Sequence, residues 1–379
     1  MKKHISKIII GLLILNFSCA QDLKPLDSEG KNSILKEEIN YEMELVFEDK
    51  NIIWSIEFFD DNSILAAVKS GSIFHFKNGT KTLIKGLPEI YLRGQGGLMD
   101  LAFHPNFEEN NLLYISYASS DNKEDGGNTT IARAKLIDNS LQNFEVLYKA
   151  NPDTKKGQHF GGRMAFDNEN YLYFSIGDRG NRNVYPQNIN LDGGKIYRIH
   201  DDGKVPSDNP FFNDNDAKKA IYSYGHRNPQ GMFKHPESGK IWTNEHGPRG
   251  GDEINIIEKG KNYGWPKITY GINYSGTTIT KNKSLPGMEQ PLYYWVPSIA
   301  PSSFEYISSD IYPDWKGSLL SGALVYKFVE RTKLKNNKVV LRTKIAEKLG
   351  RPRDIKQGPD GYIYVAIENK GVYKILPKK

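Results

Sequence analysis

Residues 359–365 read Pro-Asp-Gly-Tyr-Ile-Tyr-Val, a tight turn followed directly by a short strand. Proline, aspartate and glycine are favoured in turns, and an alternating run of aromatic and β-branched residues is typical of a β-strand. The same order recurs along the chain: a turn rich in Asp, Asn, Pro or Gly, then a short strand. This recurrence decides the fold, because a unit repeated at intervals is the signature of a repeat architecture.

The turn-and-strand unit occurs six times. Its copies cover residues 60–65, 105–115, 167–174, 236–242, 315–320 and 359–365. Dividing ~360 residues among six units leaves about 60 for each, more than the ~40–45 of a simple propeller blade. The excess falls in Gly/Asn/Pro-rich inserts, chiefly 178–219 and 262–298. The pattern predicts an all-β, six-bladed β-propeller with long loop inserts on one face, and such inserts usually carry the functional site.

The end of the chain fits this closed architecture. The last predicted strand, Gly371 to Ile375, is expected to close the ring with the N-terminal region. The 379 residues alone would suggest two domains, but a propeller of this size is a single closed unit. A pair of β-sandwiches is the alternative, and repeated units with irregular inserts favour radial repetition over it.

The N-terminus has the features of an export signal. Three lysines precede a short apolar run, and small residues precede Gln21, which predicts a signal peptide over residues 1–20. Cys19, the only cysteine, supports a second interpretation, a lipoprotein signal with a lipid anchor at that residue. Residues 21–40 are expected to be a flexible leader and 41–379 the propeller. The protein is therefore predicted to be exported, periplasmic or secreted, with a membrane attachment only through Cys19.

The charge balance excludes a nucleic-acid partner. The net charge is +6, and the first twenty residues contribute three lysines and no acidic residue, so the remainder carries +3. Nucleic-acid binding proteins usually carry a basic stripe, and the chain has none beyond a lysine-rich C-terminal segment, which is expected to be solvated surface.

Two polar clusters in the first half could carry chemistry. Gly94-Gln95-Gly96-Gly97 allows a close backbone approach to a flat ligand, or alternatively makes a tight turn between blades. The second cluster runs from 157 to 163, with His159 between glycines, and continues at Asp178. A histidine in this setting suits a general base, with the aspartate holding its tautomer. The competing interpretation is a structural histidine.

Three more clusters follow. Arg227 and Asn228, within Gly-His-Arg-Asn-Pro-Gln-Gly, could hold a carboxylate or a quinone oxygen, or form a surface ion pair. The loop 244–266 offers carboxylates and free carbonyls on a Gly/Pro-rich backbone, which suit calcium, whereas zinc lacks a second His or Cys at ligand spacing. Arg351 and Arg353 face the same side of an extended segment and could clamp two carboxylates.

Together these clusters describe a base, several anion-holding cations and a hard-metal loop. The chain has no nucleotide-binding glycine motif, no serine nucleophile elbow and no redox thiol pair. The residues therefore indicate a redox or hydrolytic enzyme acting on a polar substrate, without choosing between the two.

In this order, the clusters resemble the soluble glucose and aldose sugar dehydrogenases that use pyrroloquinoline quinone (PQQ), over about residues 41–375. The motifs that carry the resemblance are His-x-Gly-Gly-Arg, Ile-Gly-Asp, Gly-His-Arg-Asn-Pro-Gln-Gly, Glu-His-Gly-Pro-Arg-Gly-Gly-Asp-Glu-Ile-Asn, Gly-Lys-Asn-Tyr-Gly-Trp-Pro and Arg-x-Arg-Asp. The resemblance implies a six-bladed propeller that oxidises an aldose at C1 to the lactone, with hydride transfer to PQQ and electrons passed to an external acceptor.

The resemblance also implies roles for individual residues. His159 would take the proton of the sugar hydroxyl, Asp178 would orient it, and Arg227 would stabilise developing charge on the quinone. The PQQ contacts it implies are Gln95, His159, Arg227, Asn228, Ala323, Leu324, Lys327, Arg351 and Arg353. The calcium ligands it implies are the carbonyls of Gly247 and Pro248 beside PQQ, and Glu253 with Tyr263 at a second, structural site.

One departure from the family pattern stands in the segment 321–327. Val325 occupies the position where the family commonly has a PQQ-contacting lysine. Lys327, two residues on and hence on the same face of the predicted strand, is expected to take its place. Two other functions remain open: a non-catalytic carbohydrate-binding propeller, motivated by Val325, and a calcium-dependent lactonase that uses His159 as its base.

Overall fold

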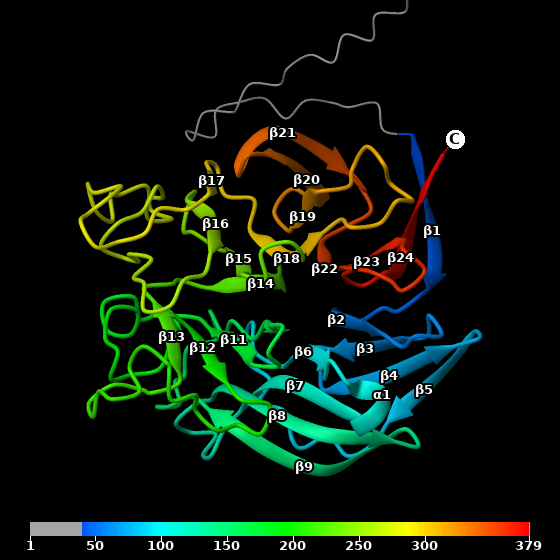
Figure 1. Ribbon diagram of the computed structural model, residues 1–379, viewed down its shortest axis with the longest axis horizontal. Coiled ribbons are helices and arrows are strands. Elements are labelled where there is room, and N and C mark those ends of the chain that lie inside the picture. Colours follow the sequence, from blue (N-terminus) through cyan, green and yellow to red (C-terminus); the bar gives the residue numbers. More distant parts are fainter. Residues whose placement is uncertain (1–39, 379) are drawn as a thin grey trace, which may run out of the picture.

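The computed structural model describes residues 40–378. The predicted signal peptide over 1–20, with Cys19, and the leader up to residue 39 lie outside the described residues. Residues 40–378 form six four-stranded antiparallel sheets around a common centre, so the predicted six-bladed propeller is confirmed (Figure 1). No helix among these residues is long and apolar enough to cross a membrane.

Each blade runs outward from an inner strand that borders the centre of the ring. The first three blades are β2 Ile53–Phe58, β3 Ile64–Val68, β4 Ser72–Lys77 and β5 Thr80–Ile84; β6 Leu98–Phe103, β7 Leu112–Ser119, β8 Asn128–Ile137 and β9 Ser140–Lys149; and β10 Met164–Phe166, β11 Leu172–Ile176, β12 Lys195–Ile199 and β13 Ile221–Tyr224. A single helical turn, α1 Phe107–Asn110, lies between β6 and β7.

The remaining blades complete the ring. They are β14 Pro229–Lys234, β15 Ile241–Glu245, β16 Asp252–Ile256 and β17 Tyr293–Trp295; β18 Pro301–Tyr306, β19 Ser318–Ala323, β20 Phe328–Lys335 and β21 Lys338–Ile345; and β22 Pro352–Gln357, β23 Ile363–Ile367, β24 Gly371–Pro377 and β1 Tyr41–Phe47. The N-terminal strand β1 pairs antiparallel with β24. This confirms the predicted closure of the ring by the last strand and the N-terminal region.

The six predicted turn-and-strand units occupy equivalent positions in the six blades. Each is the turn between the first and second strands of a blade, together with that second strand. The second strands are apolar almost throughout because neighbouring blades cover both of their faces. In β3, Leu65 and Ala67 pack with Leu113 of the next blade, whereas Ala66 packs with Tyr364 and Ala366 of the preceding one.

The predicted inserts differ in where they lie. Strand β12 divides the first insert, residues 178–219, into two loops. The loop 177–194 joins the end of β11 to the start of β12, and the loop 200–220 joins the end of β12 to the start of β13. Because these strands are antiparallel, the two loops lie at opposite ends of the blade. Residues 257–292, between β16 and β17, run alongside β13, where Asn262 forms a bridge with Tyr224. This second insert thereby reaches the end of the ring at which the inner strands begin.

A buried ion network ties the inner strands together. Nη1 of Arg163 lies 3.0 Å from a carboxylate oxygen of Asp100 and 3.0 Å from one of Asp354. Nε of Arg163 donates to the carbonyl of Gln230, and the second Asp354 oxygen accepts from the backbone N–H of Ile56. These contacts join five blades near the axis of the ring, beneath the loops that carry the predicted site residues.

Candidate active site

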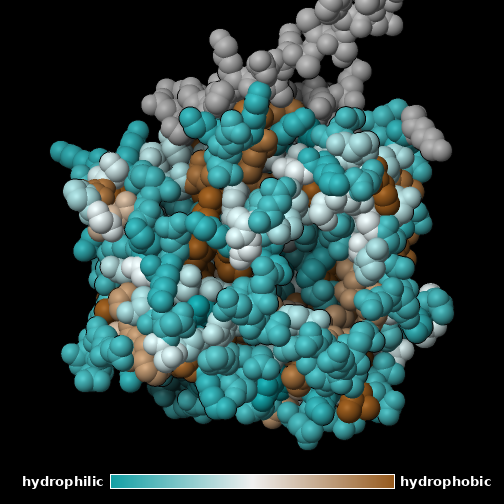
Figure 2. Space-filling model, viewed as in Figure 1, coloured by the Kyte–Doolittle hydropathy of each residue, from teal (hydrophilic) through white to brown (hydrophobic). Residues whose placement is uncertain are grey.

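The predicted site residues gather at the end of the ring where the inner strands begin. Gln95, His159 and Arg227 lie just ahead of β6, β10 and β14, whereas Asp178 and Gly247 follow the second strands β11 and β15. The centre of the ring is hollowed in the space-filling view and is bordered mostly by hydrophilic residues (Figure 2). The radial arrangement thus brings together segments that lie far apart in the sequence.

Two adjoining cavities hold most of these residues. One, of about 300 Å³, is lined by Gln158, His159, Asp178, Arg182, Arg227, Pro248 and Trp265, among others. The other, of about 400 Å³, is lined by residues that include Lys69, Gln95, His246, Leu324, Val325, Arg351, Arg353 and Glu368. The backbone N–H of His159 donates to Oε1 of Gln95 over 2.7 Å, which connects the two cavities.

His159 and Asp178 form a directed pair in the first cavity. Nδ1 of His159 lies 2.6 Å from Oδ1 of Asp178, and Trp265 Nε1 donates to the other Asp178 oxygen over 2.8 Å. His159 has φ +55°, a left-handed conformation that is rare for a residue other than glycine and turns the ring toward Asp178. Because Nδ1 is engaged, Nε2 is the nitrogen free to accept a proton from a ligand.

The electrostatics of this pair favour a neutral base. Burial and the nearby positive charge of Arg227 lower the pKa of His159, and the hydrogen bond to Asp178 opposes this only in part. Burial alone would raise the pKa of Asp178, but its bonds to His159 and Trp265 and the charge of Arg227 hold it below its usual value. At neutral pH the aspartate is therefore ionised and the imidazole unprotonated.

Arg227 is fixed from two sides. Its backbone N–H donates to Oε2 of Glu245 over 2.6 Å, and its Nη1 donates to the carbonyl of His246 over 2.9 Å. The guanidinium lies 5.4 Å from the ring of Trp265. Glu245 also binds Nδ1 of the buried His226, so this carboxylate anchors the whole turn. The sequence motif included Glu245 but did not reveal this anchoring role.

Asn228 offers a buried donor without a partner. Its Oδ1 accepts from the backbone N–H of Gly161 over 3.2 Å, whereas no described residue accepts a hydrogen bond from its buried Nδ2. An unpaired buried donor costs free energy on the order of 1–3 kcal/mol. A ligand that places an acceptor at this point would remove that cost.

In the second cavity, Arg351 and Arg353 share one carboxylate. Nε of Arg351 lies 2.7 Å from Glu368 Oε2, and Nε of Arg353 donates to Glu368 Oε1 over 2.9 Å. Nη1 of Arg351 also donates to the carbonyl of Leu324 over 3.0 Å. The predicted pair of arginines is therefore together, but Glu368, which sequence reasoning missed, neutralises half of their charge.

The segment 321–327 differs from the prediction. Strand β19 ends at Ala323, which is buried in the core, and residues 324–327 form a turn. Leu324 and Val325 line the second cavity, with Val325 53% exposed. Lys327 is exposed, has φ +60° and lines neither cavity. The expectation that Val325 and Lys327 share a strand face is wrong, because strand alternation does not extend into a turn.

The loop that carries Gly247 and Pro248, the predicted calcium ligands, is anchored by Asp252. The backbone N–H of Gly247 donates to Oδ1 of Asp252 over 2.7 Å, and the other oxygen of this buried carboxylate accepts from Ile299 N–H over 2.7 Å. Pro248 lines the first cavity. The carbonyls of Gly247 and Pro248 are thus carried by an anchored backbone, and such oxygens suit a hard cation.

Glu253, a predicted calcium ligand, is a partly buried carboxylate with a raised pKa. Burial and the charge of Glu245 raise the pKa of Glu253 to about 8, and its one hydrogen bond, over 3.1 Å, comes from Asn255. The Tyr263 ring stacks on His226, 4.5 Å away, which fixes the backbone of that segment. Residues 40–378 contain no group of three or more His, Cys, Asp or Glu side chains that could hold a metal. Carbonyl oxygens would therefore have to complete the coordination.

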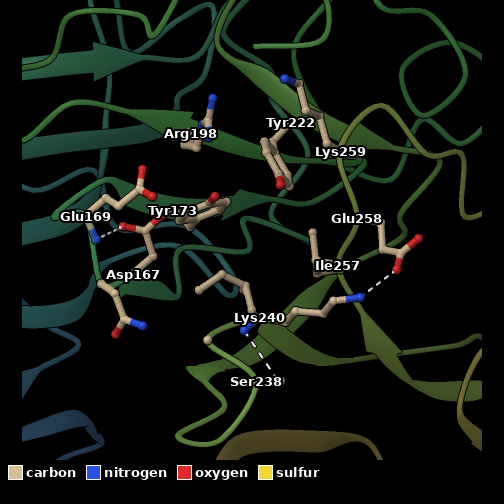
Figure 3. A pocket seen from close by; sticks show the side chains of 13 residues that line it. Asp167, Glu169, Tyr173, Arg198, Tyr222, Ser238, Lys240, Ile257, Glu258 and Lys259 are labelled. Carbon is tan, nitrogen blue, oxygen red and sulfur yellow. Dashed lines mark hydrogen bonds and ion pairs between the residues drawn. The ribbon is translucent and has the colours of Figure 1, made fainter. Parts of the chain in front are cut away.

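A third cavity, of about 450 Å³, contains none of the predicted site residues (Figure 3). It lies between the third and fourth blades, beside the turns that connect the first and second strands. Its charged groups are largely satisfied by neighbours: Lys240 pairs with Glu258 over 2.9 Å, and Asp167 accepts from the backbone of its own turn. No histidine is among the described residues that line this cavity, so it offers no base comparable to His159.

Comparison with known proteins identifies the family. Residues 50–375 match the family model described as glucose/sorbosone dehydrogenase. The aldose sugar dehydrogenase YliI of Escherichia coli K12 is 39% identical over 335 residues, which cover 86% of this chain and 90% of that protein. The quinoprotein glucose dehydrogenase B of Acinetobacter calcoaceticus is 33% identical over 302 residues, 72% of this chain and 60% of that protein.

Solved structures agree with the family match. The soluble aldose sugar dehydrogenase of Escherichia coli in its apo-form superimposes with a TM-score of 0.84 at 37% identity, covering 89% of this chain and 100% of that one. The PQQ-bound aldose sugar dehydrogenase of Streptomyces coelicolor shares the fold, with a TM-score of 0.73 at 22% identity over 91% of this chain and 100% of that one. The chain belongs to the glucose/sorbosone dehydrogenase family and is, as its motifs predicted, an oxidoreductase of the sugar dehydrogenase class.

Proposed function

We propose that this enzyme oxidises the C1 hydroxyl of aldose sugars to the lactone, with PQQ and calcium as cofactors and an external electron acceptor. The observation that carries the proposal is the His159–Asp178 pair, which engages Nδ1 and leaves Nε2 free on a residue that lines a cavity together with Arg227. Relatives named aldose sugar dehydrogenase and quinoprotein glucose dehydrogenase support the same substrate class, and the second name supports a quinone cofactor.

The base has a defined task in this reaction. The hydroxyl proton of the sugar passes to Nε2 of His159 as the carbonyl of the lactone forms. Asp178 keeps Nδ1 protonated and stabilises the imidazolium that results. Bound PQQ would supply the chemistry of hydride acceptance from C1 and of two-electron transfer to the external acceptor. Arg227 contributes a fixed positive charge beside the reacting atoms, which is electrostatic preorganisation.

The residues of both cavities suit this cofactor. PQQ carries several carboxylates, which Arg351 and Arg353 would hold, and quinone oxygens, for which Asn228 has an unpaired buried donor. Gln95 and Leu324 line the same space. The carbonyls of Gly247 and Pro248 would hold a calcium ion next to the cofactor.

A second calcium is proposed at Glu253 and the carbonyl of Tyr263. A partly buried carboxylate whose pKa is raised to about 8 gains from a cation more than a fully solvated one does. This ion would serve stability, since it would tie β16 to the insert that reaches the active site. Ala323 and Lys327, by contrast, line neither of these two cavities, and the proposal gives them no contact with the cofactor.

The decisive assay is PQQ-dependent dye reduction. The purified protein is loaded with calcium and PQQ and tested on a panel of aldoses, beside a His159→Gln variant. Activity that requires PQQ and disappears in the variant supports the proposal. Lactone hydrolysis in the absence of PQQ would instead identify a lactonase, and sugar binding without either reaction would identify a binding module.

Export is proposed separately from the activity. Its support is the lysine-flanked apolar run within residues 1–20, with Cys19 as the alternative anchor. Mass spectrometry of the protein from its native cell decides between a chain that begins at Gln21 and an acylated chain that begins at Cys19. A full-length chain that retains Met1 would refute both.

A further inference from the structure

Lys69 brings a positive charge into the second cavity without a carboxylate partner. It follows β3 directly, in the turn before β4, and lines the same cavity as Arg351 and Arg353. Its Nζ donates to the carbonyl of Gly94 over 2.8 Å. Among residues 40–378, no carboxylate forms an ion pair with it. Lys69 did not figure among the sequence predictions because it is a single lysine at the end of an ordinary strand.

The other cations of the cavity are already engaged. Arg351 and Arg353 both bind Glu368, whose side chain is only 7% exposed. His246 is engaged as well, since its Nε2 donates to the carbonyl of Pro301 over 2.8 Å. Lys69, Arg351 and Arg353 thus bring three positive charges to the cavity against the one carboxylate of Glu368, and Lys69 is the one of the three that forms no ion pair with a carboxylate of residues 40–378.

The backbone around Lys69 is shaped to accommodate it. A Cβ at Gly97 would lie 2.8 Å from Lys69 Cγ and 2.3 Å from its carbonyl oxygen, so only glycine leaves room for the stem of the lysine. The N–H of Leu98 donates to that carbonyl over 2.9 Å. The glycine-rich segment 94–97, which the sequence suggested as a close approach to a ligand, therefore also supports Lys69.

We propose that Lys69 binds a carboxylate of PQQ and supplies the anion-binding charge that the turn 324–327 does not provide. This inference rests on the proposed function and extends it to a residue outside the predicted set. A lysine ammonium is a mobile point charge that can exchange a carbonyl acceptor for a carboxylate with little rearrangement. Val325 lines the cavity with an apolar side chain, and Lys327 lies outside it.

The test is a direct measurement of PQQ affinity. Isothermal titration of PQQ into the calcium-loaded protein is carried out on the unaltered chain, Lys69→Met and, as a matched control, Lys327→Met. Loss of a charge-assisted contact is expected to raise Kd roughly tenfold to a hundredfold in Lys69→Met. Lys327→Met is expected to change Kd by less than about twofold, since it removes an exposed charge outside the cavity.

Two further measurements separate binding from folding. Lys69→Arg keeps the charge and is expected to retain most of the affinity, and the thermal unfolding of all variants should coincide. The salt dependence of Kd should be weaker in Lys69→Met than in the unaltered chain, because an ionic contact has been removed.

The possible failures are distinguishable. Unchanged PQQ affinity in Lys69→Met, with an unaltered chain that binds PQQ, would overturn the role of Lys69 and leave the proposed function standing. An equal loss in Lys69→Met and Lys327→Met would also overturn it, since the effect would then be general surface charge. An unaltered chain that fails to bind PQQ would overturn both the inference and the proposed function.

Discussion

Nδ1 of His159 lies 2.6 Å from Oδ1 of Asp178, although the two residues belong to different segments on either side of β10 and β11. Asp178 is itself held by the indole of Trp265, which comes from the insert between β16 and β17. Residues of two blades thus orient the base, so the tautomer of His159 depends on the packing of these blades in the ring.

Replacing Asp178 with asparagine is expected to impair catalysis through His159. The change removes the charge that raises the pKa of His159, and it replaces a carboxylate, which only accepts hydrogen bonds, with an amide that can also donate. The tautomer of His159 is then no longer fixed, so we expect kcat to fall by roughly 10²- to 10⁴-fold. Steady-state kinetics with saturating PQQ measure this. Titration of PQQ serves as the control and should show little change, and a kcat within about threefold of the unaltered enzyme would contradict the proposed role.

The pH profile should report a base with a lowered pKa. Because burial and Arg227 lower the pKa of His159, the acidic limb of kcat/KM is expected below the ordinary histidine value of about 6.5. As the pH falls through the pKa of His159, the imidazole becomes protonated and the rate declines. Arg227→Gln removes one cause of the lowering, so its residual activity should show a limb moved to higher pH. A limb that stays in place would argue against this electrostatic coupling.

The ion network at the centre should make Arg163 important for stability. Arg163→Met leaves Asp100 and Asp354 buried without their common partner, and breaking a buried pair in this way costs about 3–5 kcal/mol. Denaturant unfolding measures the loss. Lys123→Met, which removes an exposed pair with Glu89, is the control and should cost less than about 1 kcal/mol. Equal effects of the two variants would show that the network does not support the ring.

Calcium removal should lower the unfolding temperature through Glu253. A ligand present at a hundredfold excess over its Kd stabilises the folded state by about 2.7 kcal/mol, so a chelator should lower the melting temperature by several degrees. Glu253→Gln should lose much of this response. Glu258→Gln, which alters an exposed pair with Lys240, should keep it. Differential scanning fluorimetry with and without calcium makes the comparison, and a full chelator response in Glu253→Gln would exclude the site.

Local sequence patterns were sufficient for much of the architecture. The turns and alternating strands predicted six repeated units, because turn chemistry and side-chain alternation act over a few residues. The closure of the ring by Gly371 to Ile375 followed from the same pattern and is confirmed by the pairing of β24 with β1. His159 and Asp178 were paired correctly because their motifs are distinctive and adjoin neighbouring strands.

Other features depended on the assembled ring. The prediction that Val325 and Lys327 lie on one strand face was wrong, because the chain forms a turn at these residues. Glu368 and Lys69 carry no distinctive motif, yet they share a cavity with Arg353. Asp354 reaches Arg163 across 191 residues of sequence. The sequence by itself determined the blades and the motifs at their ends, since both arise from short-range preferences. Only the tertiary structure decided which charges meet, because closing the ring brings the first and last blades together and a local pattern does not encode that contact.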